Sequence, residues 1–363
     1  MDGSPFVKHV RPDWEELLRC IRRQGQPKRV HCIELLLDDE IQEAICERFD
    51  VRAGFNHDDP YFDLKTQIAL QRFLGYDYVT SSLEGVELAF NGVLTDDTAG
   101  LQRPGGRSFI DEHSGPITSW AELEGYPWPD AASASTRSLE WYEANLPDDM
   151  CVIGFRGFGH LLEYITWLLG YETLCYALHD RRDLVTAVSE KVTGLSTAVA
   201  ERVLQFSRVK ALWGSDDMGF RTGTLISPKD LREFVLPGHK RLAQLAHDAG
   251  RPYLLHSCGQ LRSIMPDLIE DVKIDAKHSF EDVIEPVTSC KRTYGDRIAL
   301  LGGIDMDFLC RAEPDAVRGR VRETLDQCMP GGGYCLGTGN SVANYVPLGN
   351  YLAMLDEGRA YGW

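Results

Sequence analysis

The chain has 363 residues, of which 43% are hydrophobic and 26% are charged, a balance typical of a soluble globular protein with a substantial core. The formal net charge is -17 and no Lys/Arg-rich run offsets it, so we expect no nucleic-acid or anionic-membrane partner. The amino-terminal stretch lacks the apolar core of a signal peptide, and no run approaches the roughly 18 apolar residues of a membrane span, so we expect a cytoplasmic protein.

Ten cysteines are scattered along the chain without a C-x-x-C pair. This spacing is unlike the disulfide frameworks of small secreted domains. We therefore expect most of the thiols to be reduced, buried and inert.

In chain order, residues 1 to about 28 are predicted to form a helical arm. After it, short apolar runs alternate with amphipathic segments, the pattern of a parallel α/β fold. The predicted strands cover 29–36, 76–80, 151–155, 209–213, 252–256, 273–277, 298–303 and 333–337. The predicted helical segments include 63–75, 184–206, 227–250 and 313–328. Eight such units predict an α/β fold of the (β/α)8 TIM-barrel type, in a single domain over 1–363.

The segment from about 81 to 150 is too long and too rich in Gly and Pro for a simple connection. We interpret it as an insertion over the barrel mouth that contains a hairpin, because long loops at that face usually shape substrate sites.

Polar residues that close the apolar runs are the first candidates for chemistry, because active sites of such barrels lie at the carboxyl ends of the strands. This set comprises Glu34, Asp77, Arg156, Asp216, Asp217, His256, Cys258, His278, Asp305 and Cys335.

A metal site is predicted at "LLHSCGQL" (254–261). His256 and Cys258 are two residues apart at the end of an apolar run, and on a strand such residues share a face. Cys335, in the last predicted strand, could supply a third ligand. One imidazole and two thiolates favour zinc, and three protein ligands leave the fourth position open for catalysis.

From "WGSDDMGFRTGTLISPKDLREFVLPGHKRL" through "LLHSCGQLRSIMPDLIE" and "KRTYGDRIALLGGID" to "GGGYCLGTGNSVANYVPLGNYLAML", the chain resembles the uroporphyrinogen decarboxylase superfamily of (β/α)8 barrels. The resemblance covers roughly residues 200 to 360. It is looser before that, through "GFGHLLEYITWLLGYETLCYALHD".

That superfamily includes tetrapyrrole decarboxylases and zinc methyltransferases that move methyl groups between corrinoid proteins and thiols or other acceptors. In the methyltransferases, His-x-Cys and a later Cys bind zinc, which implies His256, Cys258 and Cys335 here. The decarboxylases carry an arginine-rich motif after the first strand and a G-H-G near the carboxyl terminus. This chain has "HCIELLLDDEI" and "GTGNSV" in those places, so the resemblance favours the methyltransferase branch.

The same resemblance implies a carboxylate that occupies zinc until substrate displaces it. Asp217 or its neighbour Asp216 is the first candidate for this catalytic role, and Glu34 is the second. Residues considered for binding an anionic substrate group are Arg156, His160, Tyr76, Arg221 and, in the Gly-rich turn "GGGYCLGTGN", Asn340.

The sequence thus predicts a zinc-dependent methyltransferase that acts on a small-molecule methyl acceptor or donor. We expect the corrinoid on a separate partner protein, because no cobalamin-binding segment is found in this chain. Two alternatives stay open: uroporphyrinogen decarboxylase-type decarboxylation of a tetrapyrrole, and a non-catalytic zinc-binding barrel. The sequence is also compatible with a homodimer.

Overall fold

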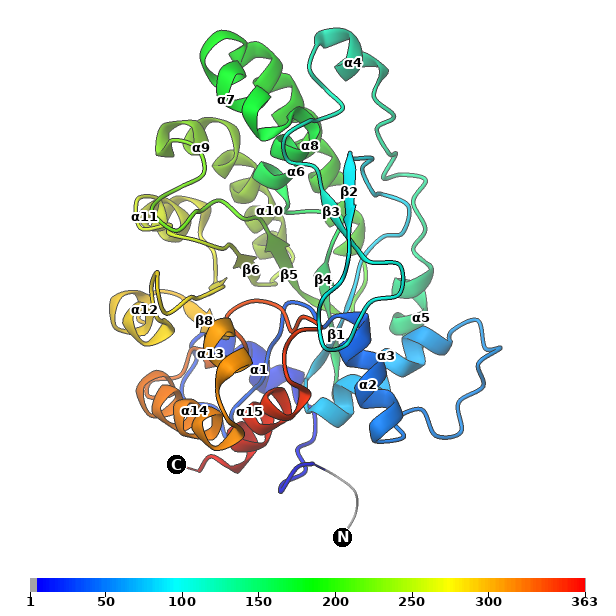
Figure 1. The fold of residues 1–363 in the computed structure, drawn as a ribbon, viewed down its shortest axis with the longest axis vertical. Helices are drawn as coiled ribbons and strands as arrows, with labels where there is room; N and C mark the ends of the chain where they lie inside the picture. The colour runs from blue at the N-terminus through cyan, green and yellow to red at the C-terminus, as the bar shows by residue number, and fades with distance from the viewer. Residues whose placement is uncertain (1–4, 363) are drawn as a thin grey trace.

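The computed structural model describes residues 5–362 and contains a curled parallel sheet surrounded by helices (Figure 1). Seven strands pair in the order β1-β4-β5-β6-β7-β8-β9, all of them parallel. Their bounds are β1 (Tyr78–Ser81), β4 (Cys151–Phe155), β5 (Val209–Ser215), β6 (Tyr253–His256), β7 (Ala276–His278), β8 (Ala299–Leu301) and β9 (Tyr334–Cys335). Most of their residues are buried, as expected for a parallel sheet covered by helices. The predicted α/β barrel architecture is confirmed, with seven of the eight predicted runs forming regular strands.

The eighth position belongs to residues 30–37, which do not form the regular strand predicted over 29–36. Single parallel bridges join Cys32 to Leu336 and Leu37 to Val342 on the β9 side. On the β1 side, the Tyr78 hydroxyl accepts a hydrogen bond from the backbone N–H of Glu34 at 2.9 Å and donates one to its C=O at 2.9 Å. A side chain therefore takes the place of a strand ladder where the barrel closes.

Helices cover the outside of the sheet and follow the predicted segments closely (Figure 1). The predicted 227–250 helix is divided into two, because Pro237 in the first turn of α10 has no N–H to continue a helix. The Ser227 hydroxyl caps α9 by accepting a hydrogen bond from the N–H of Asp230 at 3.1 Å. The helices outside residues 82–150 are α1 (Trp14–Ile21), α2 (Asp39–Arg48), α3 (Phe62–Leu74), α6 (Leu161–Leu169), α7 (Tyr171–Asp180), α8 (Arg182–Val203), α9 (Pro228–Phe234), α10 (Leu236–Asp248), α11 (Met265–Asp267), the π-helical turn η1 (Leu268–Val272), α12 (Val287–Tyr294), α13 (Met306–Arg311), α14 (Pro314–Cys328) and α15 (Leu348–Ala360).

The predicted insertion contains the expected hairpin. Strands β2 (Gly92–Thr95) and β3 (Arg107–Ile110) pair antiparallel, and α4 (Trp120–Gly125) and α5 (Arg137–Asn145) follow. The predicted amino-terminal arm contains α1, which lies at the amino ends of the strands: the N–H of Trp14 donates to the C=O of Asp149, just before β4. Residues 1–4 of that arm and residue 363 lie outside the described residues, and the single-domain boundaries stay a prediction.

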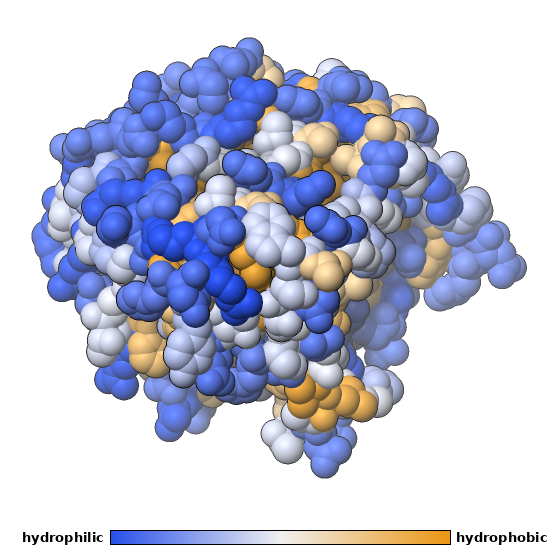
Figure 2. Space-filling view, turned by 90° about the horizontal axis from the view of Figure 1, so that it is seen from above, coloured by the Kyte–Doolittle hydropathy of each residue, from blue (hydrophilic) through white to orange (hydrophobic). Residues whose placement is uncertain are grey.

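The surface of the molecule is mostly polar on the face shown in Figure 2. Seen from above, the apolar side chains of this face gather in separate patches. Among residues 5–362, no helix combines the length and the apolar character needed to cross a bilayer.

Candidate metal centre and substrate cavity

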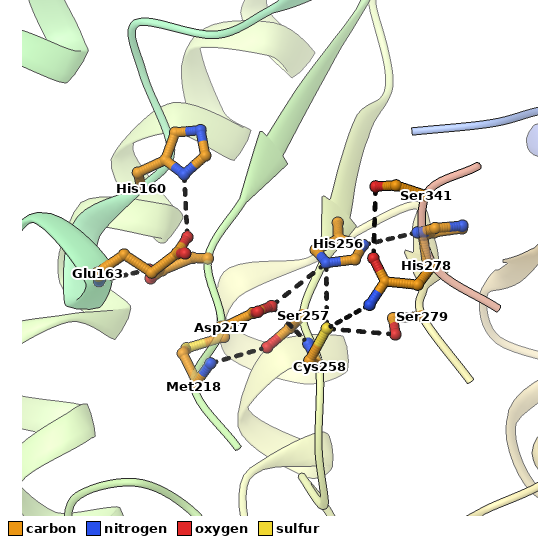
Figure 3. A network of polar contacts seen from close by, with 12 residues as sticks. His160, Glu163, Asp217, Met218, His256, Ser257, Cys258, His278, Ser279 and Ser341 are labelled. Carbon is orange, nitrogen blue, oxygen red and sulfur yellow. Dashed lines mark hydrogen bonds and ion pairs between the residues drawn. The ribbon is translucent and has the colours of Figure 1, made fainter. Parts of the chain in front are cut away.

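Three side chains with metal-binding atoms meet beyond the carboxyl ends of β5 and β6: Asp217, His256 and Cys258 (Figure 3). His256 Nε2 lies 3.2 Å from Asp217 Oδ1 and 3.3 Å from Cys258 Sγ, and one ligand atom from each residue lies within 4.8 Å of the others. The backbone N–H of Cys258 also donates to Asp217 Oδ1 at 2.8 Å. The predicted pairing of His256 with Cys258 is therefore present, and the carboxylate that joins them was a sequence candidate.

Two glycines allow the segments that follow β5 and β6 to lie in close contact. A Cβ on Gly219 would lie 2.6 Å from the C=O oxygen of Cys258, and Gly259, with φ +80°, contacts the backbone of Gly219. Backbone atoms can approach this closely only where a side chain is absent. The glycines of the "DDMG" and "HSCG" stretches therefore allow the Asp217 carboxylate and the Cys258 thiol to lie close together. The two glycines could indicate this contact in the sequence only if β5 and β6 were already known to be neighbours.

A second ring of residues orients the cluster. His256 Nδ1 and His278 Nδ1 are 2.7 Å apart, and the parallel register places these residues opposite each other on β6 and β7. Asn340 Nδ2 donates to Cys258 Sγ at 3.3 Å, and Ser279 Oγ lies 3.5 Å from the same sulfur. Burial lowers the pKa of His278 well below its usual range, so this imidazole is neutral. A proton on His256 Nδ1 then has an acceptor, which leaves the Nε2 lone pair facing Asp217 and Cys258.

The charges within the cluster favour a cation. Burial, followed by the Asp217 carboxylate, raises the pKa of the Cys258 thiol well above its usual range. Burial alone would also raise the pKa of Asp217, but its contacts with His256 and with the Cys258 N–H lower that pKa well below the ordinary value. A thiol beside an ionised carboxylate resists deprotonation unless a positive charge joins them.

The donor set fits zinc, which takes imidazole nitrogen, thiolate sulfur and carboxylate oxygen in tetrahedral sites. From ordinary zinc–ligand bond lengths, neighbouring ligand atoms around one ion are roughly 3.4 to 3.6 Å apart. The two contacts made by His256 Nε2, at 3.2 and 3.3 Å, are within a few tenths of an ångström of that spacing.

Cys335 does not join this cluster, so the structure corrects the predicted third ligand. Its thiol is fully buried and contacts Cys20 of α1, at the opposite end of the barrel. The chain comes within hydrogen-bonding distance of the cluster after β9 has ended at Cys335. Asn340, predicted as a substrate ligand, is the residue of this segment that contacts Cys258.

Asp216 is also placed away from the cluster, which corrects its proposed catalytic role. Its carboxylate accepts hydrogen bonds from the N–H groups of Leu162 and Glu163, both at 3.0 Å, and lies 2.8 Å from His239 Nε2. It therefore stabilises the first turn of α6, where an anion compensates free N–H groups. Two other strand-end candidates are structural as well: Asp77 precedes β1 and contacts His31 at 2.7 Å, and Asp305 caps α13.

A cavity of about 740 Å³ opens at the carboxyl ends of β1, β4 and β5, and its lining does not include Asp217, His256 or Cys258. Of the predicted residues, Glu34, Arg156 and His160 line it. Tyr76 does not, because it is fully buried at 2.6 Å from the hydroxyl of Tyr351, so its predicted substrate contact is wrong in this structure. Arg221 is exposed on the loop after β5 and does not line this cavity.

Glu34 is a buried carboxyl group at the edge of this cavity. Its oxygens accept hydrogen bonds from the Thr338 N–H at 2.8 Å and the Thr338 hydroxyl at 2.6 Å. Burial raises the pKa of Glu34 to about 8, against the smaller opposing effect of Thr338. The group is therefore largely protonated at neutral pH.

Glu163 is a site residue that sequence reasoning missed. It lines a second cavity, of about 520 Å³, together with Asp217, and it pairs with His160 Nδ1 at 2.9 Å (Figure 3). Burial raises the pKa of Glu163, with His160 opposing and Asp217 adding to the rise. Its position inside an amphipathic helical stretch gave no sign of this role. Trp167, four residues further along α6, lines both cavities.

Comparisons with known proteins agree with this architecture. The curated relative named methylated-thiol–coenzyme M methyltransferase, from Methanosarcina mazei, is 31% identical over 169 residues, which are 45% of this chain. The match spans 43% of that relative's length. A solved structure described as a methyltransferase from Methanosarcina mazei superposes with a TM-score of 0.67 at 16% identity, over 94% of this chain and 97% of the other.

The family model described as uroporphyrinogen decarboxylase (URO-D) matches residues 114–361. This range contains the whole Asp217, His256 and Cys258 cluster, and it excludes Glu34 and the residues up to Phe90 that line the larger cavity. With more than half of its length matched, this chain belongs to the uroporphyrinogen decarboxylase (URO-D) family.

Proposed function

We propose that this protein is a zinc-dependent methyltransferase that moves a methyl group between a corrinoid carried by a partner protein and a small thiol or similar acceptor. The observation that carries the proposal is the convergence of Asp217, His256 and Cys258 beside a cavity large enough for a small molecule. The curated relative, whose name states methyl transfer from a methylated thiol to coenzyme M, supports the reaction class.

In this proposal Asp217, His256 and Cys258 hold the zinc. The ion, when bound, supplies a positive charge that lowers the pKa of a thiol bound beside it and so makes the sulfur nucleophilic at neutral pH. His278 fixes the ring of His256, and the amide of Asn340 donates to the sulfur of Cys258. These contacts hold the ligands in one geometry before substrate arrives, which limits the reorganisation that the reaction requires.

Decarboxylation of a tetrapyrrole is less well supported. A substrate with many carboxylates needs several cationic side chains to hold it. Among the described residues that line the larger cavity, Arg156 is the single Lys or Arg, whereas Asp39, Glu84 and Glu87 are acidic. A cavity of this charge would repel such a substrate.

The test combines a metal determination with an activity assay. We expect about one equivalent of zinc per chain and transfer of the methyl group of methylcobalamin to members of a panel of anionic, neutral and cationic thiols. Cys258→Ala should lose both zinc and transfer, and Cys335→Ala, the matched thiol control, should keep both. Zinc without any transfer would favour the non-catalytic barrel, and conversion of uroporphyrinogen to a less carboxylated product would favour the decarboxylase.

A further inference from the structure

The wall of the larger cavity is aromatic on one side. Phe90, from the insertion, and three residues of the α6 region, His160, Tyr164 and Trp167, contact one another and all line the cavity. The ring centroids of Phe90 and Trp167 are 5.2 Å apart with planes at 78°, and those of Phe90 and Tyr164 are 5.5 Å apart at 38°. Phe90, Tyr164 and Trp167 therefore pack against one another at inclined angles and form one continuous aromatic wall of the cavity.

The charge around this aromatic wall is negative. Glu87 lines the same cavity and lies close enough to the Tyr164 hydroxyl to help raise the pKa of that phenol, although burial has the larger effect. Within residues 5–362 no ion pair of Glu87 is found. The His160 imidazole, by contrast, has a partner, because its Nδ1 lies 2.9 Å from the Glu163 carboxylate. The one guanidinium on the wall belongs to Arg156, whose side chain is exposed.

Aromatic faces carry a negative potential that attracts cations, and compact organic cations with methyl groups are the ligands that several such faces suit best. The carboxylate of Glu87, which is exposed, adds a weaker attraction that salt reduces. An anionic ligand would instead meet the negative faces of three or four rings and an unpaired carboxylate.

We propose that this cavity binds a methylated ammonium or sulfonium group against Phe90, Tyr164 and Trp167, with Glu87 as the counter-charge. The cation belongs to the small molecule that exchanges a methyl group, and only this assignment rests on the proposed function. Trp167 also lines the cavity that contains Asp217, so this one side chain borders both the proposed cation site and the cavity of the candidate metal centre. The substrate class is therefore cationic, unlike the anionic thiol in the curated relative's name.

The test is a binding measurement, which does not depend on methyl transfer. Calorimetric titration of the full chain, with and without added zinc, compares choline and trimethylsulfonium with 3,3-dimethyl-1-butanol, a neutral molecule of the same shape as choline, and with 2-mercaptoethanesulfonate, an anionic thiol. We expect the cations to bind about ten-fold or more tightly than the neutral molecule, the discrimination that desolvated cation–π contacts provide.

Variants locate the site. Trp167→Leu should weaken cation binding by about ten-fold or more, and Phe90→Leu, an independent wall variant, should weaken it several-fold. Glu87→Gln should weaken it most at low ionic strength. Trp120→Leu, at an exposed tryptophan of α4 outside the cavity, should leave binding unchanged.

Equal binding of the neutral molecule, tighter binding of the sulfonate, or cation binding that survives both wall variants would overturn the proposal. Loss of methyl transfer with cation binding intact would instead count against the proposed function alone.

Discussion

The two halves of the barrel mouth differ in how they are built. The half formed by β5, β6 and β7 holds the candidate ligands through parallel strand pairing, the contact between Gly219 and Gly259, and side-chain bonds, and it lies within the family match. The other half, formed by residues 30–37, β1 and the segment up to Phe90, contributes much of the cavity wall and lies outside that match. The candidate ligands thus lie within the family match, whereas the cavity wall combines residues inside the match, such as Tyr164 and Trp167, with residues outside it, such as Phe90.

The largest expected effect concerns the half of the barrel mouth that holds the candidate metal ligands. Cys258→Ala or His256→Ala should weaken zinc binding by more than about 100-fold, because even residues outside a ligand set contribute 10- to 100-fold. Competition with a chromophoric chelator measures the affinity. Cys335→Ala, with its thiol beside Cys20, should bind zinc like the parent, and a loss there would restore Cys335 as a ligand.

The next prediction concerns the cavity half and its pH dependence. In the unfolded chain Glu34 titrates near 4.5, and in the folded protein near 8. Between these values the folded state binds more protons, so stability should fall as pH rises, by roughly 5 kcal/mol at most. Glu34→Gln should flatten this part of the stability curve.

Urea unfolding at several pH values between the two pKa values checks this. Glu84→Gln, a carboxylate of the same cavity with exposed surroundings, is the matched control and should keep the parent slope. Parallel curves for the parent and Glu34→Gln would show that burial of Glu34 does not control stability in this range.

Removal of His278, whose ring contacts that of His256, tests whether the two halves of the barrel mouth act independently. His278→Ala should lower zinc affinity by about 10- to 100-fold without removing a ligand, because His256 Nδ1 loses its partner at 2.7 Å. The same chelator competition measures it. Cation binding in the cavity should be unaffected, and a parallel loss there would show that the two halves act as one unit.

The smallest expected effect is at the closure of the barrel. Tyr78→Phe leaves the N–H and C=O of Glu34 without their shared partner and should cost about 2 kcal/mol of unfolding free energy. Tyr76→Phe, which loses one bond to another side-chain hydroxyl, should cost about 1 kcal/mol. Urea denaturation distinguishes the two, and equal losses would mean that the Tyr78 contact has no special role in closure.

The sequence predicted the barrel because buried apolar runs and amphipathic helices recur with a regular spacing. It also identified His256 and Cys258, since residues two apart on a strand share a face. It misplaced Cys335, because periodicity cannot tell where a two-residue strand stops or which end of the barrel its side chain reaches. Glu163 and the contact of His278 with His256 depend on pairing between distant segments, which no local pattern reports.

The contacts that join residues 30–37 to β1 also determine how easily the barrel opens at that point. Between residues 29–34 and β1 the barrel is joined by side chains, since the Tyr78 hydroxyl bonds the backbone of Glu34 and the Asp77 carboxylate contacts Arg29 and His31. Because such contacts can break one at a time, we expect this part of the barrel to open locally more readily than the strand pairs between β4, β5 and β6.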